Sequence, residues 1–284
     1  MRKEYYCLIA GLPDLFFDAS KISSPLLDFK LHLKEELTKD DYYLVESYFS
    51  RYDNYNLLAL LEKKDTEFNQ KGNLTKEDFE TIFSLMKENT LKSFTKIIPP
   101  YFEKFIIAFR NDEPIIPNKS LENQITELYY KYLENVDNSF INEWYFFEKD
   151  LNNIMAAANC KKYQIPVEPE LIGSNELTEK LIKSSAKDFG IGNEFPKIEQ
   201  IFRVLEETNL IEREKKIDLM KWELLDEKTF FHYFTIEKIF AFILKLEIID
   251  RWLNLNKETG QELLHKLLNE LETSQKFSEE FDQK

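Results

Sequence analysis

Residues 67–78, EFNQKGNLTKED, have part of the spacing of a calcium-binding loop. Gly72 is sixth, Leu74 is eighth and the acidic Asp78 is twelfth, as in a helix–loop–helix calcium site. Such a loop supplies an oxygen ligand from its fifth position, where this chain has the cation Lys71, and Asp78 is shorter than the usual bidentate glutamate. We therefore interpret the segment as a turn followed by a capped helix, and we expect no metal site.

The histidines and cysteines do not have the spacing of a metal or catalytic site either. They are His32, His232, His265, Cys7 and Cys160. The histidines form no HExxH or HxxxH pair, and the cysteines form no CxxC motif. The motifs GxSxG, GxGxxG and GxxxxGK[ST] are absent, so we interpret residues 190–192, GIG, as a turn and expect no cofactor.

Acidic residues are too numerous for a pair of them to indicate catalysis. The chain has 52 Asp and Glu residues, and nothing in their spacing singles out a general acid and a general base. We expect no catalytic residues, with a helical enzyme that has an acidic pocket as the alternative. That alternative predicts that Asp53, Asp150 and Asp250 converge on one cleft with perturbed ionisation.

Two segments 97 residues apart share a pattern of polar and apolar residues. The first reads DNYNLLALL from Asp53, and the second reads DLNNIMAAA from Asp150. Both have an aspartate followed three residues later by an asparagine, Asn56 or Asn153, and both continue with apolar residues. Residues at i and i+3 share one helix face, so we expect each pair to hydrogen-bond a neighbouring loop or to cap another helix.

A third, weaker copy begins at Asp250 in DRWLNL, where Asn254 is displaced by one position. Self-similarity at this period predicts helical modules of roughly 90–100 residues. We divide the chain into an N-terminal module, residues 1–110, a middle module, residues 111–200, and a C-terminal module, residues 201–284.

The whole chain has the composition and spacing of an all-α protein. It contains only 6 glycines and 9 prolines, 43% of its residues are hydrophobic, and no segment sustains the alternation typical of strands. Linkers are expected at residues 111–118 and 165–174. The predicted helices cover residues 26–37, about 40–62, 75–88, 101–109, about 119–135, 138–163, 175–188, 194–208, 211–226, 235–255 and 257 to near the end.

The predicted helix over residues 138–163 carries an aromatic face. Its apolar residues recur at spacings of four and three, which places them on one stripe. They are Phe140, Trp144, Phe147, Leu151, Ile154 and Ala158. Because Tyr145 and Phe146 lie off this stripe, we expect an apolar face wide enough for two neighbouring helices. We interpret the aromatic residues as core rather than as a ligand site.

The charge and hydropathy of the chain restrict its partners. It has 38 Lys and Arg against 52 Asp and Glu, a formal charge of −14, which repels nucleic acid and anionic lipid and is compatible with a basic protein partner. No apolar run approaches the roughly 20 residues that a membrane-spanning helix needs. We expect a cytoplasmic protein without a signal peptide, whose thiols are reduced.

Two segments resemble the C/d family of central-stalk proteins in V-type and archaeal-type ATPases. Residues 146–165, FFEKDLNNIMAAANCKKYQI, are similar to a helix in that family with an acidic-leucine-x-asparagine-isoleucine pattern. Residues 232–256, HYFTIEKIFAFILKLEIIDRWLNLN, resemble its long apolar C-terminal helix. YYCLIAGLPDL and REKKIDLMKWELLDE resemble an uncharacterised bacterial branch associated with such ATPases. The chain departs from the family in having Asn159-Cys160 where members usually carry an arginine, and in being short.

The resemblance implies repeated helical modules arranged as a funnel, and a non-catalytic role. Members of the family sit on the cytoplasmic face of the membrane rotor ring and receive the central stalk, which couples ATP-driven rotation to ion transport. The implied partners are the rotor-ring proteolipid and the central-stalk subunits, with the membrane reached only through them. A helical adaptor of another complex is the alternative.

Overall fold

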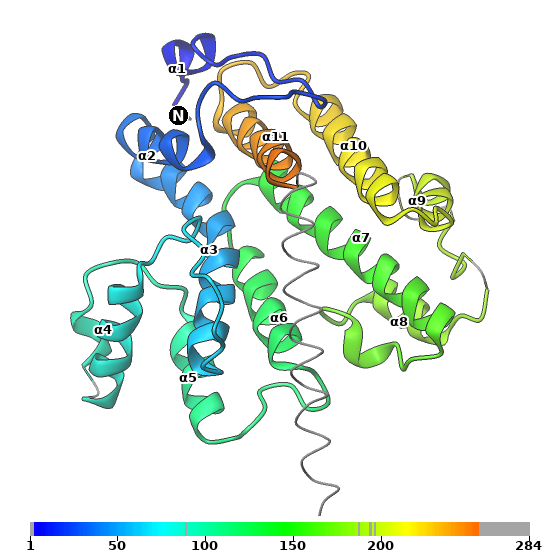
Figure 1. Ribbon diagram of the computed structural model, residues 1–284, viewed down its shortest axis with the longest axis horizontal. Helices are drawn as coiled ribbons and strands as arrows, with labels where there is room; N and C mark the ends of the chain where they lie inside the picture. The colour runs from blue at the N-terminus through cyan, green and yellow to red at the C-terminus, as the bar shows by residue number, and fades with distance from the viewer. Residues whose placement is uncertain (1–2, 89, 187, 193–194, 196, 256–284) are drawn as a thin grey trace, which may run out of the picture. The chain divides into compact units, whose positions relative to one another are not determined.

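The computed structural model describes residues 3–88, 90–186, 188–192, 195 and 197–255 (Figure 1). Within these ranges every regular element is a helix, which confirms the all-α prediction, and none of these helices is long and apolar enough to cross a bilayer. The α-helices are α1 (Tyr6–Ala10), α2 (Leu26–Glu36), α3 (Lys39–Leu61), α4 (Lys76–Lys87), α5 (Tyr101–Arg110), α6 (Leu121–Leu133), α7 (Ser139–Tyr163), α8 (Glu176–Lys183), α9 (Ile198–Leu205), α10 (Leu210–Lys228) and α11 (Ile236–Asn254). Two 3-10 turns are η1 (Leu91–Ser93) and η2 (Glu168–Glu170). The helix predicted from residue 257 lies outside the described residues.

Capping boxes determine where α4 and α8 begin. Thr75 accepts a hydrogen bond from the Asp78 N–H, and the Asp78 carboxylate accepts one from the Thr75 N–H, as the sequence predicts. Asn175 and Thr178 make the same reciprocal pair at the start of α8. Each box satisfies N–H groups that the first helical turn leaves unpaired.

Two helices are shorter than predicted because a turn lies between them. α8 ends at Lys183 instead of near residue 188, and α9 begins at Ile198 instead of near residue 194. In the intervening segment Phe189 and Gly190 have φ of 54° and 70°, in the left-handed region that a right-handed helix cannot include. Residues 190–192 belong to this turn.

α7 packs against two helices, α6 and α8, as the predicted width of its apolar face requires, but Phe146 lies outside the buried part of that face. Tyr145 is buried as expected, but Phe146 is 43% exposed, and the Nζ atom of Lys149 lies 4.9 Å from the centre of its ring. At the other end of the helix Ala157 is fully buried, whereas Ala158 is half-buried. The buried residues of α7 therefore include Tyr145 and Ala157, and Phe146 lies at the edge of the face that they form.

The chain divides into two compact units, which do not coincide with the three predicted modules. One unit comprises residues 33–231, and the other contains both the N-terminal segment, residues 3–32, and residues 232–255. In the second unit the Tyr5 N–H donates to the Phe234 carbonyl at 2.7 Å, and the rings of Phe29 and Phe242 lie 5.0 Å apart. These contacts join α11 to the beginning of the chain. The three-module division stays a prediction.

In the unit of residues 33–231, α6 packs against α3, α5 and α7, and Figure 1 shows it between α3 and α7. Stacked rings of Phe79 and Phe102, 6.3 Å apart, join α4 to α5. A separate apolar cluster joins the second half of α7 to α8, α9 and α10. Its buried members are Leu151, Ile154, Ala157, Leu171, Leu181, Phe189, Ile191, Ile198, Ile201, Val204, Ile217 and Met220.

The order of helices repeats along the chain. α2, α3, α4 and α5 begin at residues 26, 39, 76 and 101, and α6, α7, α8 and α9 begin at 121, 139, 176 and 198, shifts of 95, 100, 100 and 97 residues. Within this order α3 corresponds to α7, and α4 corresponds to α8. The aspartate–asparagine pairs found in the sequence lie on α3 and α7.

Candidate functional site

The side chain of Asn56 holds the loop between α3 and α4. Its Nδ2 donates to the Asn69 carbonyl at 2.9 Å, and its Oδ1 accepts from the Asn69 N–H at 2.8 Å. Asn56 is 1% exposed, so water does not compete for these bonds. One amide side chain therefore satisfies both backbone groups of a single loop residue, an arrangement that we call the first clamp.

Asp53, one helical turn earlier, holds the next part of the same loop. Its Oδ1 accepts from the N–H groups of Asn73 and Leu74 at 2.8 and 3.0 Å, and its Oδ2 accepts from Asn73 Nδ2 at 2.9 Å. The loop passes so close that a Cβ atom on Gly72 would lie 2.4 Å from Asp53 Oδ1. This close approach requires a residue without a side chain at position 72.

Asn153 on α7 makes the second clamp with the same geometry. Its Nδ2 donates to the Ile172 carbonyl at 2.9 Å, and its Oδ1 accepts from the Ile172 N–H at 2.8 Å. Asp150 is again one turn earlier and hydrogen-bonds Asn175, the cap of α8. The hydrogen bonds to a neighbouring loop that the sequence pattern predicts are thus present in both copies.

A group of charged residues braces the loop of the second clamp against α6. Lys119 Nζ donates to the Leu171 carbonyl at 2.6 Å and to Glu127 Oε2 at 2.5 Å. Glu127 also accepts from the Gly173 N–H at 3.2 Å and pairs with Lys131 at 3.0 Å. Burial is the largest single effect and raises the pKa of the Glu127 carboxyl, but the hydrogen bonds that it accepts from Lys119, Lys131 and the Gly173 N–H, together with the charge of Lys119, lower the pKa below its ordinary value.

A largely buried ion pair connects the two clamp helices at equivalent positions. Arg51 lies two residues before Asp53, and Glu148 lies two residues before Asp150. Their two contacts measure 2.6 Å from Nη2 to Oε2 and 3.3 Å from Nη1 to Oε1, and Lys221 of α10 approaches Glu148 at 3.8 Å. Burial acts to raise the pKa of Glu148, but Arg51 and Lys221 hold it below its ordinary value.

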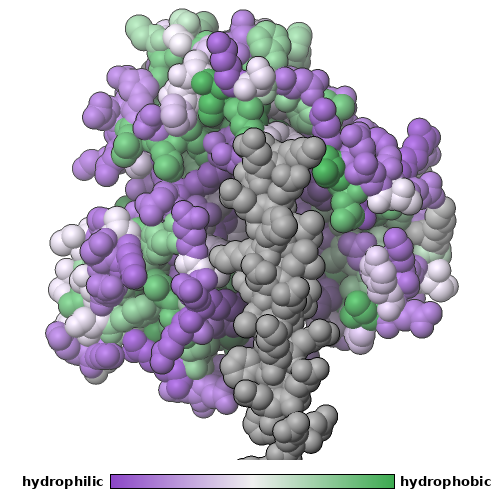
Figure 2. Space-filling view, viewed as in Figure 1, coloured by the Kyte–Doolittle hydropathy of each residue, from purple (hydrophilic) through white to green (hydrophobic). Residues whose placement is uncertain are grey.

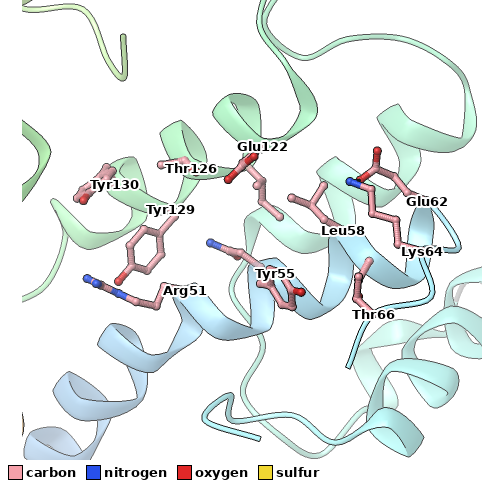
Figure 3. A pocket seen from close by; sticks show the side chains of 13 residues that line it. Arg51, Tyr55, Leu58, Glu62, Lys64, Thr66, Glu122, Thr126, Tyr129 and Tyr130 are labelled. Carbon is pink, nitrogen blue, oxygen red and sulfur yellow. Dashed lines mark ion pairs between the residues drawn. The ribbon is translucent and has the colours of Figure 1, made fainter. Parts of the chain in front are cut away.

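A cavity of about 290 Å³ lies beside this ion pair, between α3 and α6 (Figure 3). Arg51 and Tyr129 are at one end of it, and Glu62 and Lys64, which pair at 2.9 Å, are at the other. The Tyr129 hydroxyl donates to the Tyr48 carbonyl at 3.0 Å. Arg51, Tyr129, Glu62 and Lys64 are thus each paired, and Glu122 is a further carboxylate of the lining.

Tyr130 also lines this cavity, and its hydroxyl is a poor base. Burial, reinforced by the Glu148 carboxylate, holds the pKa of the Tyr130 hydroxyl well above its ordinary value. The hydroxyl therefore stays protonated near neutral pH and does not act as a base.

The aspartates of the first two copies of the repeat bind different loops. Asp53 and Asp150 each face the loop that follows their own helix, and Asp250 is half-buried on α11, in the other unit. Among the residues that the structure describes, no group of three His, Cys, Asp or Glu side chains could hold a metal ion. In the described parts of the chain, the side chains of α3 and α7 hold the loops that follow these helices in place.

Spacing in the sequence found the aspartates and asparagines, but it missed Arg51, Glu148, Lys119 and Glu127. Arg51 and Glu148 are themselves 97 residues apart, which is the repeat distance, so the signal for this pair was present. Nothing in the sequence pairs Lys119 with the Leu171 carbonyl.

Comparisons with known proteins give one match. A family model described as "Protein of unknown function (DUF2764)" matches residues 1–275, a range that includes both clamps and α11. No curated protein and no solved structure matches the chain.

We expect Gly72→Ala to lower the free energy of unfolding by about 1–3 kcal/mol, because the new methyl group overlaps Asp53 Oδ1 and forces the loop away. Chemical denaturation measures the change. Gly192→Ala is the matched control, since its Cβ would lie 3.6 Å from the nearest atom, an ordinary contact. Equal stability of the two variants would contradict the close approach.

We expect Asn153→Ala to lower the free energy of unfolding by roughly 1–3 kcal/mol, because it leaves the N–H and carbonyl groups of Ile172 buried without the clamp. Asn159→Ala, an exposed position on the same helix, should change stability by less than about 0.5 kcal/mol. Thermal melts in which both variants match the parent would refute the clamp.

We expect Glu148→Gln to lower the free energy of unfolding by about 3 kcal/mol at pH 7, because it leaves the charge of Arg51 buried without its partner. This value is at the lower end of the range for buried ion pairs, since a quarter of the Arg51 side chain is exposed to solvent. The folded-state pKa of Glu148 is lowered, so its contribution is complete above the unfolded pKa and is lost as pH falls through the folded value. The difference between parent and variant should therefore shrink in acid.

Urea denaturation at a series of pH values measures this difference. Glu199→Gln, which alters an exposed pair with Arg203 at 3.4 Å, is the control and should change little at any pH. A deficit in Glu148→Gln that stays constant throughout the acid range would show that the carboxylate charge is not what stabilises the fold.

Proposed function

The chain belongs to the DUF2764 family, and we propose that it is a non-catalytic subunit of a V-type ATPase that links the central stalk to the membrane rotor ring. In this role it couples ATP-driven rotation to ion transport. The partners are the rotor-ring proteolipid and the central-stalk subunits, and the chain reaches the inner face of the membrane only through them.

The observation that carries this proposal is a repeated unit, which consists of a helix, a loop held by a clamp, and a capped helix. α3 and α4 are joined by the first clamp, and α7 and α8 by the second, with matching hydrogen bonds to Asn69 and Ile172. A protein that transmits torque must resist deformation between its two contact surfaces. Buried side-chain bonds to loop backbone give that resistance where an ordinary surface loop would yield.

The resemblance to the C/d family supports the same role through two described elements. The segment FFEKDLNNIMAAANCKKYQI begins on α7 and ends just after it, and it contains Asp150 and Asn153 of the second clamp. The second segment, residues 232–256, contains α11. The first of these segments thus carries the residues that build a pinned module, and the funnel arrangement is part of the proposal.

The surface chemistry agrees with docking to proteins. The formal charge of the chain is −14, and on the face seen in Figure 2 hydrophilic residues predominate over α4 and α5, with apolar residues scattered among them. An acidic surface favours basic partners and raises the rate of their association. A helical adaptor of another complex has the same requirements, so only the partners distinguish the two functions.

An enzyme with an acidic pocket has less support. Asp53 accepts three hydrogen bonds from its loop, and Arg51, Glu148, Glu62 and Lys64 are paired.

We expect the tagged protein, recovered from mildly solubilised native membranes, to bring down rotor-ring and stalk subunits in near-stoichiometric amounts. Mass spectrometry identifies the partners, and an untagged strain is the control. Deletion of the gene should abolish ATP-driven ion pumping in membrane vesicles. Recovery of the protein alone from the soluble fraction, together with intact pumping after deletion, would contradict the proposal and favour the adaptor.

A further inference from the structure

The second clamp adjoins a cavity with aromatic walls. The cavity has a volume of about 320 Å³ and lies between α7 and α10, near Phe195. The residues that line it are Phe140, Glu143, Trp144, Phe146, Phe147, Asp150, Phe195, Leu224, Leu225 and Lys228. The rings of Phe147 and Phe195 stack at 5.8 Å, and Trp144 lies 5.9 Å from Phe147. This volume is near the lower end for ligand sites, about 300–1,000 Å³.

Two polar atoms of this lining have no hydrogen-bond partner among the described residues. They are Trp144 Nε1, on a side chain that is 95% buried, and Asp150 Oδ1. Asp150 Oδ1 is an acceptor without a donor and Trp144 Nε1–H is a donor without an acceptor, and each is costly when buried. A group that only donates hydrogen bonds can satisfy Asp150 but not Trp144, so the Asp150 atom is the one that indicates such a ligand. Burial raises the pKa of the Asp150 carboxyl, against the smaller effects of Lys149 and Asn175, and an incoming donor would reverse that rise.

The first copy of the repeat shows what kind of group fits this position. There the Asn73 carboxamide is a donor to the aspartate: its Nδ2 donates to the Glu46 carbonyl at 2.8 Å and to Asp53 Oδ2 at 2.9 Å, and lies 3.4 Å from Ser50 Oγ. Glu46, Ser50 and Asp53 correspond to Glu143, Phe147 and Asp150 at the repeat distance of 97 residues. In the first copy both carboxylate oxygens of Asp53 thus accept hydrogen bonds from the chain itself, whereas in the second copy Asn175 bonds Asp150 but Asp150 Oδ1 has no partner among the described residues.

The two copies differ in the walls around this donor. Ser47 and Ser50 of the first copy become Trp144 and Phe147 in the second. Aromatic faces attract cations, and a planar guanidinium both stacks on such rings and donates several hydrogen bonds. Phe146, at the edge of the same cavity, already holds the Lys149 ammonium at 4.9 Å.

The remaining charges of the cavity favour a cation as well. Lys228 pairs with Glu143 at 2.6 Å, and Lys149 pairs with Glu134 at 3.7 Å, whereas Asp150 Oδ1 has no hydrogen-bond partner among the described residues. We propose that this cavity binds an arginine side chain of a partner protein, whose guanidinium donates to Asp150 and lies against Trp144 and Phe147. This inference holds for any partner assembly and does not depend on a rotary ATPase.

The test uses the full chain labelled with 5-fluorotryptophan, with the ¹⁹F resonance of Trp144 assigned from Trp144→Phe. Nα-acetyl-arginine amide should shift this resonance saturably in the millimolar range, as is usual for a ligand of this size. The citrulline analogue, which has the same shape without the charge, should bind about tenfold more weakly. Equal affinity for the two amides, or no saturable shift, would overturn the proposal.

Three variants test where the ligand binds and whether a loss of binding is caused by misfolding. Asp150→Asn should remove the preference for arginine over citrulline, and Phe147→Leu should weaken arginine binding several-fold. Glu122→Gln removes one negative charge from the other cavity and should leave binding unchanged. If the Asp150→Asn variant has a clearly lower melting temperature than the parent, the Phe147→Leu variant alone decides whether the ligand binds in this cavity. Arginine binding that is unaltered in a folded Phe147→Leu variant would place the ligand elsewhere and overturn the proposal.

Discussion

The hydrogen bonds from one asparagine side chain to both backbone groups of a single loop residue are the constraint on which the rest of this structure depends. Asn56 does this for Asn69, and Asn153 does it for Ile172. A connection of more than ten residues between helices normally has many conformations. Once one residue is held in the core, the remainder of the loop is short, and the capping box at its end orients the following helix.

The ion pair between Arg51 and Glu148 adds specificity to this arrangement. Removing two charges from water costs free energy that their attraction only partly offsets, so a buried pair is a weak source of stability. The pair instead determines geometry. Each charge can be buried only when the other lies beside it, so the pair fixes how α3 and α7 are positioned against each other. Because the pair joins equivalent positions of the two copies, it also ties the register of one copy to that of the other.

The sequence predicts most of the helices, and it identifies the clamp side chains on α3 and α7 but not the loop residues that they bind. Helical spacing and capping residues locate α3, α4, α6 and α7 to within a few residues, and the Asp-x-x-Asn pattern identifies the side chains of the clamps. The loop residues that they bind lie 13 and 19 positions further on, and no local pattern marks Asn69 or Ile172. The association of α11 with the N-terminal segment is also a long-range contact, which a division of the chain into consecutive modules does not anticipate.

Native-state hydrogen exchange of the Asn69 and Ile172 amides tests most directly whether pinned loops make these modules rigid. If the clamps act as described, both N–H groups exchange only through large openings, with protection close to that of the buried turns of α3 and α7. Exchange of both amides at the rate of an ordinary surface loop, while α3 and α7 remain protected, would contradict the account, because the loops would then open independently of the helices that are meant to hold them.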